Sequence, residues 1–292
     1  MNLSPINLER LNLSKMTTNL VTDMSKIFEG CEKITSLDLS NFDTSEVTDM
    51  SEMFRSCFNL KNLKFSSKFV TNNVKSMNRM FDGDKSLTEL DLSNFDTSNV
   101  ERMSAMFYVC SSLTSLDVSK FKTSKVIDFS SMFMKCSSLT SIDVSNFDTN
   151  NIKYLNTTFH SCISITSLDI SNFDFSKTIN VKQMFYNCTK LSKLNIKIVK
   201  SENLNIMNYM FSYCSSLTSL DLTGFNTDNI TQMAFMFSYS GLKYLDISSF
   251  NTSECKLFTG IFLHCEGLQI KINNETCGNL IKVLPPYVHV IE

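Results

Sequence analysis

The sequence predicts a repeat solenoid of about ten coils, each close to 26 residues long, and three recurring features carry this prediction. A phenylalanine, usually preceded by methionine, returns every 25 to 27 residues along the 292-residue chain. A leucine-rich line such as LTELDL (residues 87–92) precedes it, and a cysteine often follows it by three residues. One coil cannot bury its own apolar side chains, so stacked copies must share a continuous core. The recurring phenylalanines are Phe28, Phe54, Phe81, Phe107, Phe133, Phe159, Phe185, Phe211, Phe237 and Phe262.

Each coil is expected to open with a short β-strand. Apolar and polar residues alternate at Leu90, Asp91 and Leu92, which is the pattern of a strand with one buried face. The rest of the coil places an apolar residue every three to five positions, as a chain winding once around a narrow core requires. We therefore predict one parallel sheet of short strands along the solenoid.

The predicted organisation is one solenoid with a terminal cap. Residues 1–267 form the solenoid, and residues 268–292 form a partial coil and a C-terminal cap, with no linker between them. The predicted coils start near residues 8, 34, 60, 87, 113, 139, 165, 191, 217 and 242.

Composition and charge argue against two classes of protein. The 27 Lys and Arg residues nearly balance the 29 Asp and Glu residues, so the basic excess of a nucleic-acid-binding protein is missing. No stretch approaches 18 uninterrupted apolar residues, so membrane insertion is not expected. The first residues lack a basic start followed by an apolar run, so the sequence as written predicts no export signal.

Eight of the ten cysteines form a column three residues after the repeated phenylalanine, in which Asp84 and Ser240 fill the two gaps. Zinc binding would need closer pairs of ligands, and a disulfide ladder would need side chains that do not lie parallel. We expect buried thiols that fill space and donate weakly to the turn. The column is Cys31, Cys57, Cys110, Cys136, Cys162, Cys188, Cys214 and Cys265. Cys255 occupies another apolar column, and Cys277 lies in the terminal segment.

Aspartates form a second set of columns. Those expected to point outward between the strand leucines are Asp38, Asp91, Asp117, Asp143, Asp169, Asp221 and Asp246. A second column holds Asp43, Asp96, Asp148 and Asp174. Stacked like charges repel unless something compensates, either a cation such as Ca²⁺ or hydrogen bonds to Ser, Thr and backbone N–H groups. The Gly- and Asp-rich turn of repeat-built Ca²⁺ sites is missing, so we predict no metal-binding residues.

Two irregular coils add basic residues to the strand position. The coil from residue 60 has one extra residue and carries Lys64 where the aspartate is expected. The coil from residue 191 has Asn195 at that place, and the lysines in and beside it are Lys190, Lys193, Lys197 and Lys200. Such coils arise by drift or form a basic stripe that contacts a partner. The candidate binding face is therefore the seven outward aspartates with Lys64, Lys193 and Lys197.

A threonine column raises the possibility of a flat, ice-binding type of face, although threonine also suits strands and turns. Its members are Thr44, Thr97, Thr123, Thr149, Thr227 and Thr252.

No catalytic constellation is evident. His160 falls on a repeat surface position, and His264 is the sequence neighbour of Cys265, an arrangement that rarely makes a nucleophile–base pair. There is no phosphate-binding glycine loop and no nucleophile elbow. We predict no enzyme activity, no catalytic residues and no cofactor.

The repeated line LDLSNFDTSNV, followed by MS-x-MF-x-x-C-x-SL, closely resembles the BspA-like leucine-rich repeats of bacterial and protist surface proteins across residues 8–268. The resemblance implies a right-handed α/β solenoid displayed at the cell surface and linked to adhesion or to binding of matrix and host proteins.

The function expected from these features is non-enzymatic recognition of a protein or glycan ligand on the strand face. The alternative is an intracellular scaffold protein, favoured by the missing signal and the free thiols. A weaker alternative is cation or ice binding through the aspartate and threonine columns.

Overall fold

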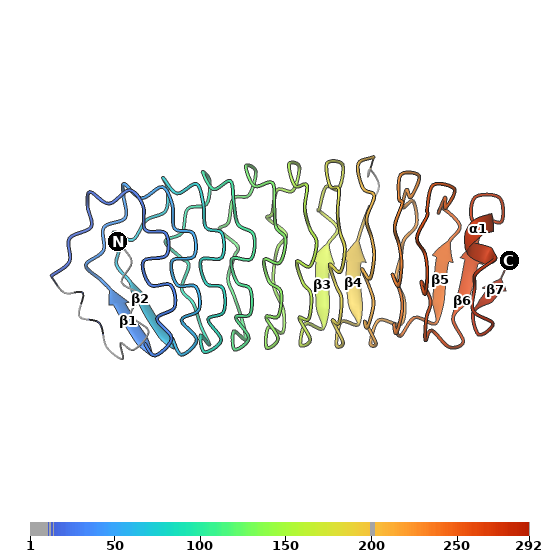
Figure 1. The fold of residues 1–292 in the computed structure, drawn as a ribbon, viewed down its shortest axis with the longest axis horizontal. Coiled ribbons are helices and arrows are strands. Elements are labelled where there is room, and N and C mark those ends of the chain that lie inside the picture. Colours follow the sequence, from blue (N-terminus) through green and yellow to red (C-terminus); the bar gives the residue numbers. More distant parts are fainter. Residues whose placement is uncertain (1–10, 12, 14, 199–201, 292) are drawn as a thin grey trace.

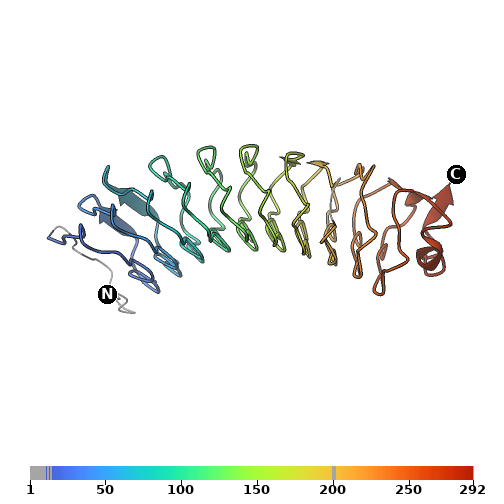
Figure 2. The ribbon, with the colours of Figure 1, turned by 90° about the horizontal axis from the view of Figure 1, so that it is seen from above.

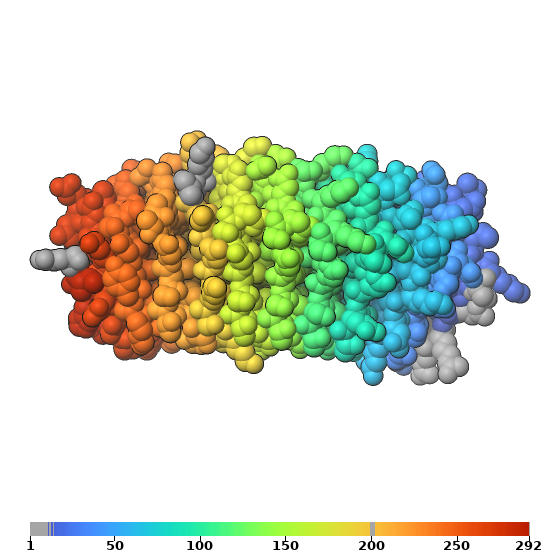
Figure 3. Space-filling view, turned by 180° about the vertical axis from the view of Figure 1, so that it is seen from behind, coloured from blue at the N-terminus to red at the C-terminus, as the bar shows by residue number. Residues whose placement is uncertain are grey.

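A computed structural model describes residues 11, 13, 15–198 and 202–291 and shows a gently curved rod of stacked coils (Figures 1 and 2). The start of the first predicted coil, Leu8, and Lys200 lie outside the described residues. The repeated phenylalanines from Phe28 to Phe262 form nine successive stacked pairs, so the chain makes about nine turns of a parallel β-solenoid. Each coil lies beside the next along the rod, as the space-filling view in Figure 3 shows.

The strands are short and all paired in parallel. In the described part of the chain they fall into three small sheets, β1–β2, β3–β4 and β5–β6–β7. Their bounds are β1 Ser36–Leu39, β2 Asn62–Phe65, β3 Ser167–Ile170, β4 Lys193–Ile196, β5 Tyr244–Ile247, β6 Gln269–Ile272 and β7 His289–Ile291. The described helix is one turn, α1 (Gly278–Ile281), near the C-terminal end.

The solenoid prediction is confirmed, but the α/β label and the single sheet are not. Opposite the strands, each coil runs through a ribbon of consecutive turns; the first such stretch is residues 25–30. Residues two before and two after the repeated phenylalanine have positive φ in every coil, for example Lys26 (59°) and Gly30 (71°). Two left-handed residues within five positions interrupt a right-handed helix, so none forms there.

Hydrogen bonds between coils hold this turn ribbon together. The N–H groups of Lys26, Phe28 and Gly30 donate to carbonyl oxygens of the next coil at 3.0, 3.0 and 2.8 Å. The N–H groups between them close turns within the coil, as Glu29 does onto the Lys26 carbonyl at 3.1 Å. The ribbon therefore satisfies its backbone without a helix or a conventional sheet.

The core is a ladder of phenylalanine rings. All ten repeated phenylalanines are at most 1% exposed. Successive rings lie nearly parallel, with centroids 5.3 to 5.9 Å apart, which is the range of offset stacking.

The left-handed positions predict a stabilising substitution. Val109 has φ of 58° although it is β-branched, and its N–H donates to the Met134 carbonyl at 2.8 Å. Val109→Gly keeps that bond and relieves the backbone, so we expect the free energy of unfolding to rise by about 1 kcal/mol. Urea denaturation measures the change. Val109→Ala is the control, because it shortens the side chain and leaves an L-residue at positive φ. Equal stability of the two variants would contradict the backbone explanation.

Candidate functional site

The strand face carries the aspartate column that the sequence predicts to point outward. In β1, Leu37 and Leu39 are buried while Asp38 between them is exposed. The same alternation places Asp91, Asp117, Asp143, Asp169 and Asp221 in solvent, whereas Asp246 is half-buried. The orientation prediction is confirmed for this column.

Only Asp38, Asp169 and Asp246 of this column lie in strands, β1, β3 and β5, so the strand predicted for every coil, with Leu90 and Leu92 as its example, is not formed in the coils of the other four. Each of the seven aspartates nevertheless caps the turn that follows it. In β1, Oδ1 of Asp38 accepts the N–H of Ser40 at 2.9 Å, and the other six make the same bond at the same distance to the Ser or Thr two residues on. These hydrogen bonds lower the pKa of all seven carboxyl groups, so the column is ionised at neutral pH.

The second carboxylate oxygen is used unevenly along the column. Oδ2 of Asp38 pairs with Lys64 Nζ at 3.5 Å, across the register of β1 and β2. Oδ2 of Asp169 accepts Nδ2 of Asn195 at 3.0 Å. Within the described residues, the Oδ2 atoms of the three aspartates between these pairs have no ion pair and no hydrogen bond: Asp91, Asp117 and Asp143.

The other two predicted lysines lie beside the same column. The turn hydrogen bonds from Ser171 are the main cause of the lowered pKa of Asp169, and Lys193 adds a smaller electrostatic effect. For Asp221, hydrogen bonds from Thr223 are the main cause of the lowered pKa, and Lys197 adds a smaller electrostatic effect. The structure thus brings all ten predicted residues onto one face.

Shallow grooves border the two irregular coils on this face. One, of about 470 Å³, is lined by Leu63, Lys64, Leu90, Asp91 and Asp117 among others. A second, of about 500 Å³, contains Ile142, Asp143, Leu168, Asp169 and Lys193. The strand face is therefore a ridge of carboxylates with hollows beside the lysines.

The threonine column lies inside the molecule, so the ice-binding interpretation is wrong for it. All six predicted members are at most 2% exposed. Thr97 Oγ1 donates to the Lys122 carbonyl at 2.9 Å and accepts the Lys122 N–H at 2.7 Å. At this corner the threonine hydroxyls take the place of backbone hydrogen bonds between coils. They are buried because they bond to backbone groups of the next coil.

The cysteine column consists of buried thiols, as predicted. All ten cysteines are free and buried. Cys136 Sγ donates to the Phe107 carbonyl of the preceding coil at 3.2 Å, and six other column cysteines make the same bond. The thiol is thus a space-filling group and a weak donor.

Among the residues that the structure describes, His160 and His264 form no pair with a nucleophile. His264 Nδ1 contacts Glu266 at 3.3 Å, while Cys265 Sγ points to the Phe237 carbonyl at 3.0 Å. His160 stacks on Tyr186, with ring centroids 4.7 Å apart, and burial lowers its pKa.

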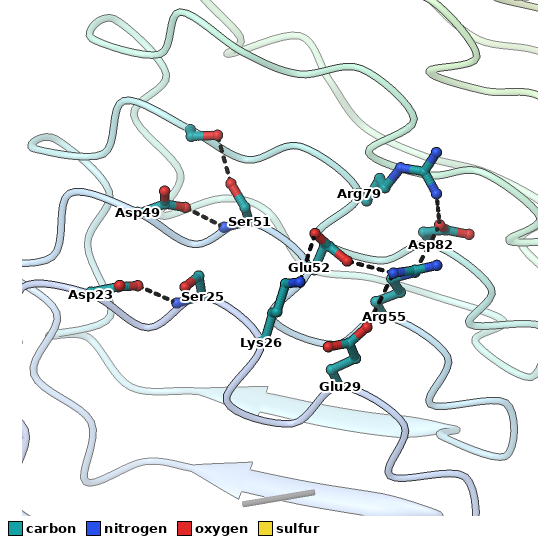
Figure 4. Close-up of polar contacts among 11 residues, drawn as sticks. Asp23, Ser25, Lys26, Glu29, Asp49, Ser51, Glu52, Arg55, Arg79 and Asp82 are labelled. Atoms are coloured by element: carbon teal, nitrogen blue, oxygen red, sulfur yellow. Dashed lines mark hydrogen bonds and ion pairs between the residues drawn. The ribbon is translucent and has the colours of Figure 1, made fainter. Parts of the chain in front are cut away.

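Sequence reasoning missed the pattern of the turn ribbon surface. Near the N-terminal end it carries charges: Arg55 pairs with Glu52 at 2.6 Å and with Asp82 at 3.5 Å, and Arg79 pairs with Asp82 at 3.2 Å (Figure 4). Further along, the equivalent positions hold aromatic side chains. Tyr209 stacks on Phe235 and Tyr213 on Tyr239, while Tyr186 meets Tyr213 edge to face. The available signal was the residue type two positions before the repeated phenylalanine and one or two positions after it.

A third column of turn aspartates was also missed. Oδ1 of Asp23, Asp49 and Asp128 accepts the N–H of the serine two residues on, at 2.7 to 2.8 Å; Figure 4 shows the first two. The D-x-S spacing that marks the other two columns was the signal.

No helix in the described part of the chain is long and apolar enough to cross a bilayer. A comparison with curated proteins finds no match.

Several solved structures are similar to this chain. A leucine-rich cell surface protein from Faecalibacterium prausnitzii A2-165 shares 16% identity over 89% of this chain and 83% of its own, with a TM-score of 0.39. A leucine-rich-repeat protein from Bacteroides ovatus ATCC 8483 shares 16% identity over 97% and 94%, with a TM-score of 0.28. An internalin from Listeria monocytogenes shares 13% identity over 94% and 81%, with a TM-score of 0.25.

One family model matches the repeats in overlapping segments, at residues 5–116, 58–162, 83–197, 111–219 and 192–283. Together these segments run from residue 5 to residue 283, which is nearly the whole chain. The chain therefore belongs to the family described as "Mycoplasma protein of unknown function, DUF285".

Proposed function

We propose that this chain is a non-enzymatic recognition module that binds a protein partner through its strand face. The observation that carries the proposal is the run of Asp91, Asp117 and Asp143. These carboxylates follow one another in successive coils, are exposed, and have Oδ2 atoms with no partner among the described residues.

The turn that these residues cap does not need their charge. At equivalent turns in other columns, asparagine does the same work: Asn180, Asn226 and Asn251 each accept the N–H two residues on, at 2.7 to 3.0 Å. Stacking like charges directly across coils is unfavourable. A column that keeps aspartate therefore carries charge beyond what its fold requires, and such charge on a regular face is available for recognition.

The charge arrangement favours a cationic, extended polypeptide as the partner. The three carboxylates lie between Lys64 at one irregular coil and Lys193 at the other, with a groove beside each. Coils rise by about 4.8 Å, so an extended chain lying along the rod would meet one carboxylate every one to two residues. The nearby Lys120 is only the last of the causes that lower the pKa of Asp91 and Asp117. A neutral glycan would add no further counter-charge, which is why we favour a protein ligand.

The test compares two triple substitutions of the same chemistry. Asp91→Asn, Asp117→Asn and Asp143→Asn together keep the turn acceptor and remove the charge from the strand face. The control is Asp96→Asn, Asp148→Asn and Asp174→Asn, whose Oδ1 atoms cap turns in the second column, each within 2.7 to 3.1 Å of an N–H group.

The probe is an array of extended peptides with lysine or arginine at alternate positions, and the same peptides with glutamate. We expect the wild type and the control to bind the basic peptides alike. The strand-face variant should bind about tenfold more weakly, since each exposed charge contributes about 0.5 kcal/mol. Unchanged binding by that variant, or no binding by the wild type, would contradict the proposal.

The location proposed for this module is the cell surface, in adhesion, and the support is the resemblance to BspA-like repeats. The ten free thiols favour the second candidate, an intracellular scaffold that uses the same face, because exported proteins commonly oxidise their cysteines. Protease treatment of intact source cells separates the two. Loss of the protein without lysis supports display, and full protection until lysis supports the scaffold.

A further inference from the structure

One junction of the solenoid has a carboxyl group in place of the column thiol. At seven junctions a cysteine Sγ donates to the carbonyl oxygen of the repeated phenylalanine in the preceding coil, at 3.0 to 3.2 Å. In the coil of Phe81, the residue at this place is Asp84, which is 0% exposed. A strongly polar group thus occupies a core position that elsewhere holds a weak donor.

The contacts of Asp84 account for only one of its two oxygens. Oδ1 accepts the N–H of Cys57 at 3.0 Å. Oδ2 is buried and has no hydrogen-bond donor among the described residues. The nearby cations are engaged elsewhere, because Arg55 and Arg79 both pair with Asp82 (Figure 4). A buried carboxylate without a cation and with one bare oxygen is strongly unfavourable.

An acceptor for a protonated Oδ2 exists at this junction. The column pattern directs the side chain of this coil to the Phe54 carbonyl oxygen, which accepts the N–H of Cys57 at 3.1 Å. A carbonyl oxygen has two lone pairs, and in other coils the second is taken by the thiol.

We propose that Asp84 is a neutral carboxylic acid whose Oδ2–H donates to the Phe54 carbonyl oxygen, which makes this junction the pH-sensitive contact of the cysteine column. Deprotonation at Oδ2 removes the donor and leaves a negative charge opposite a carbonyl oxygen. The junction between the coils of Phe54 and Phe81 then weakens.

The ionisable groups that face Asp84 are Cys57, Cys110 and Asp82, and none of them supplies a positive charge. Burial raises the pKa of Asp84 well above its usual range, the hydrogen bond from Cys57 opposes that rise, and Asp82 adds to it. In the unfolded chain an aspartate ionises near pH 4. Stability from the neutral form is therefore complete below about pH 4 and is lost as pH rises towards the folded-state pKa.

The first test is Asp84→Asn, which supplies an acceptor and a donor at the same two places whatever the pH. We expect the variant and the wild type to unfold at similar denaturant concentrations near pH 4. Above that, the wild-type unfolding constant should grow relative to that of the variant by about tenfold per pH unit, up to the folded-state pKa. The control is Asp96→Asn. Hydrogen bonds from Ser98 are the main cause of the lowered pKa of Asp96, so this carboxyl stays ionised in both states above about pH 5. The ratio of the wild-type unfolding constant to that of the control should therefore stay constant between about pH 5 and 8.

A flat ratio for Asp84→Asn over the same range, or a wild type that gains stability relative to it, would overturn the proposal. A second measurement needs no stable Asp84 variant: the infrared carbonyl band of a protonated carboxylic acid, recorded at pH 7. Burial also raises the pKa of Asp82, so the spectrum is taken on the wild type, where Asp82 engages Arg55 and Arg79, and again on Asp82→Asn. A band that persists in both supports a neutral Asp84, and its absence from the wild type overturns the assignment.

Discussion

Gly241→Ala is expected to destabilise the solenoid more than any other single-methyl addition at a described glycine. The coil from Leu217 is one residue short, because Gly241 alone fills the two places between the cysteine column and the next leucine. A Cβ at this position would overlap the Ser215 carbonyl oxygen and lie 2.9 Å from its carbon. Those are backbone atoms of the neighbouring coil, which cannot swing aside as a side chain can.

The expected cost of Gly241→Ala is about 3 kcal/mol or more in the free energy of unfolding, measured by urea denaturation. Substitutions at two other glycines serve as controls for this cost. Gly278→Ala meets no atom within 4 Å at an ordinary φ and should be nearly neutral. Gly224→Ala meets nothing either, but its φ of +76° should cost about 1 kcal/mol. If Gly241→Ala proved no worse than Gly224→Ala, the close approach of the two coils would be in doubt.

Where the same residue type recurs in most coils, the sequence alone predicted whether its side chain is buried or exposed. Phe133 and Cys136 return in a constant frame because each is surrounded by its own copies, so their burial followed from the period alone. Asp91 lies between Leu90 and Leu92, and the alternation was enough to turn it outward.

The turn ribbon could not be predicted, because no residue type marks its left-handed positions. Ala105, Thr157, Tyr209 and Phe235 share one left-handed position and have no common preference for it. The N–H groups of these residues donate to carbonyl oxygens of the next coil, and these hydrogen bonds hold that backbone. The burial of the threonines was not predicted for a related reason. The hydrogen-bond partner of Thr97 is Lys122 in the next coil, and the sequence of a single coil does not show it.

The ten residues of the candidate face stay a prediction as a binding site, and the chemistry of the aspartates among them was only half anticipated. The notion that Ser and backbone N–H groups compensate the aspartates was right for Oδ1. Which carboxylates keep a free Oδ2 depends on what the adjoining coil presents, such as Lys64 beside Asp38. That is a property of pairs of coils, and one repeat considered alone cannot show it.

Phe159→Ala is expected to break the phenylalanine ladder at its centre and cost about 3 to 5 kcal/mol in the free energy of unfolding. Phe159 is 1% exposed and stacks on Phe133 at 5.5 Å and on Phe185 at 5.9 Å. Truncation removes both stacking contacts and leaves a cavity between two coils. Phe262→Ala is the matched control, since in the described ladder it stacks on Phe237 alone.

The ladder also predicts coupling between neighbours, which separates stacking from simple burial. In a double-mutant cycle, Phe133→Ala and Phe159→Ala should interact by about 0.5 to 1.5 kcal/mol, because each ring is part of the other's surroundings. Phe133→Ala and Phe211→Ala lie three coils apart and share no contact, so their costs should add. Urea denaturation of the single and double variants measures both cycles. Equal coupling in the two pairs would mean that the destabilisation caused by one substitution spreads through the whole rod. Coupling confined to adjacent rings would establish that each coil is stabilised by the two coils it touches.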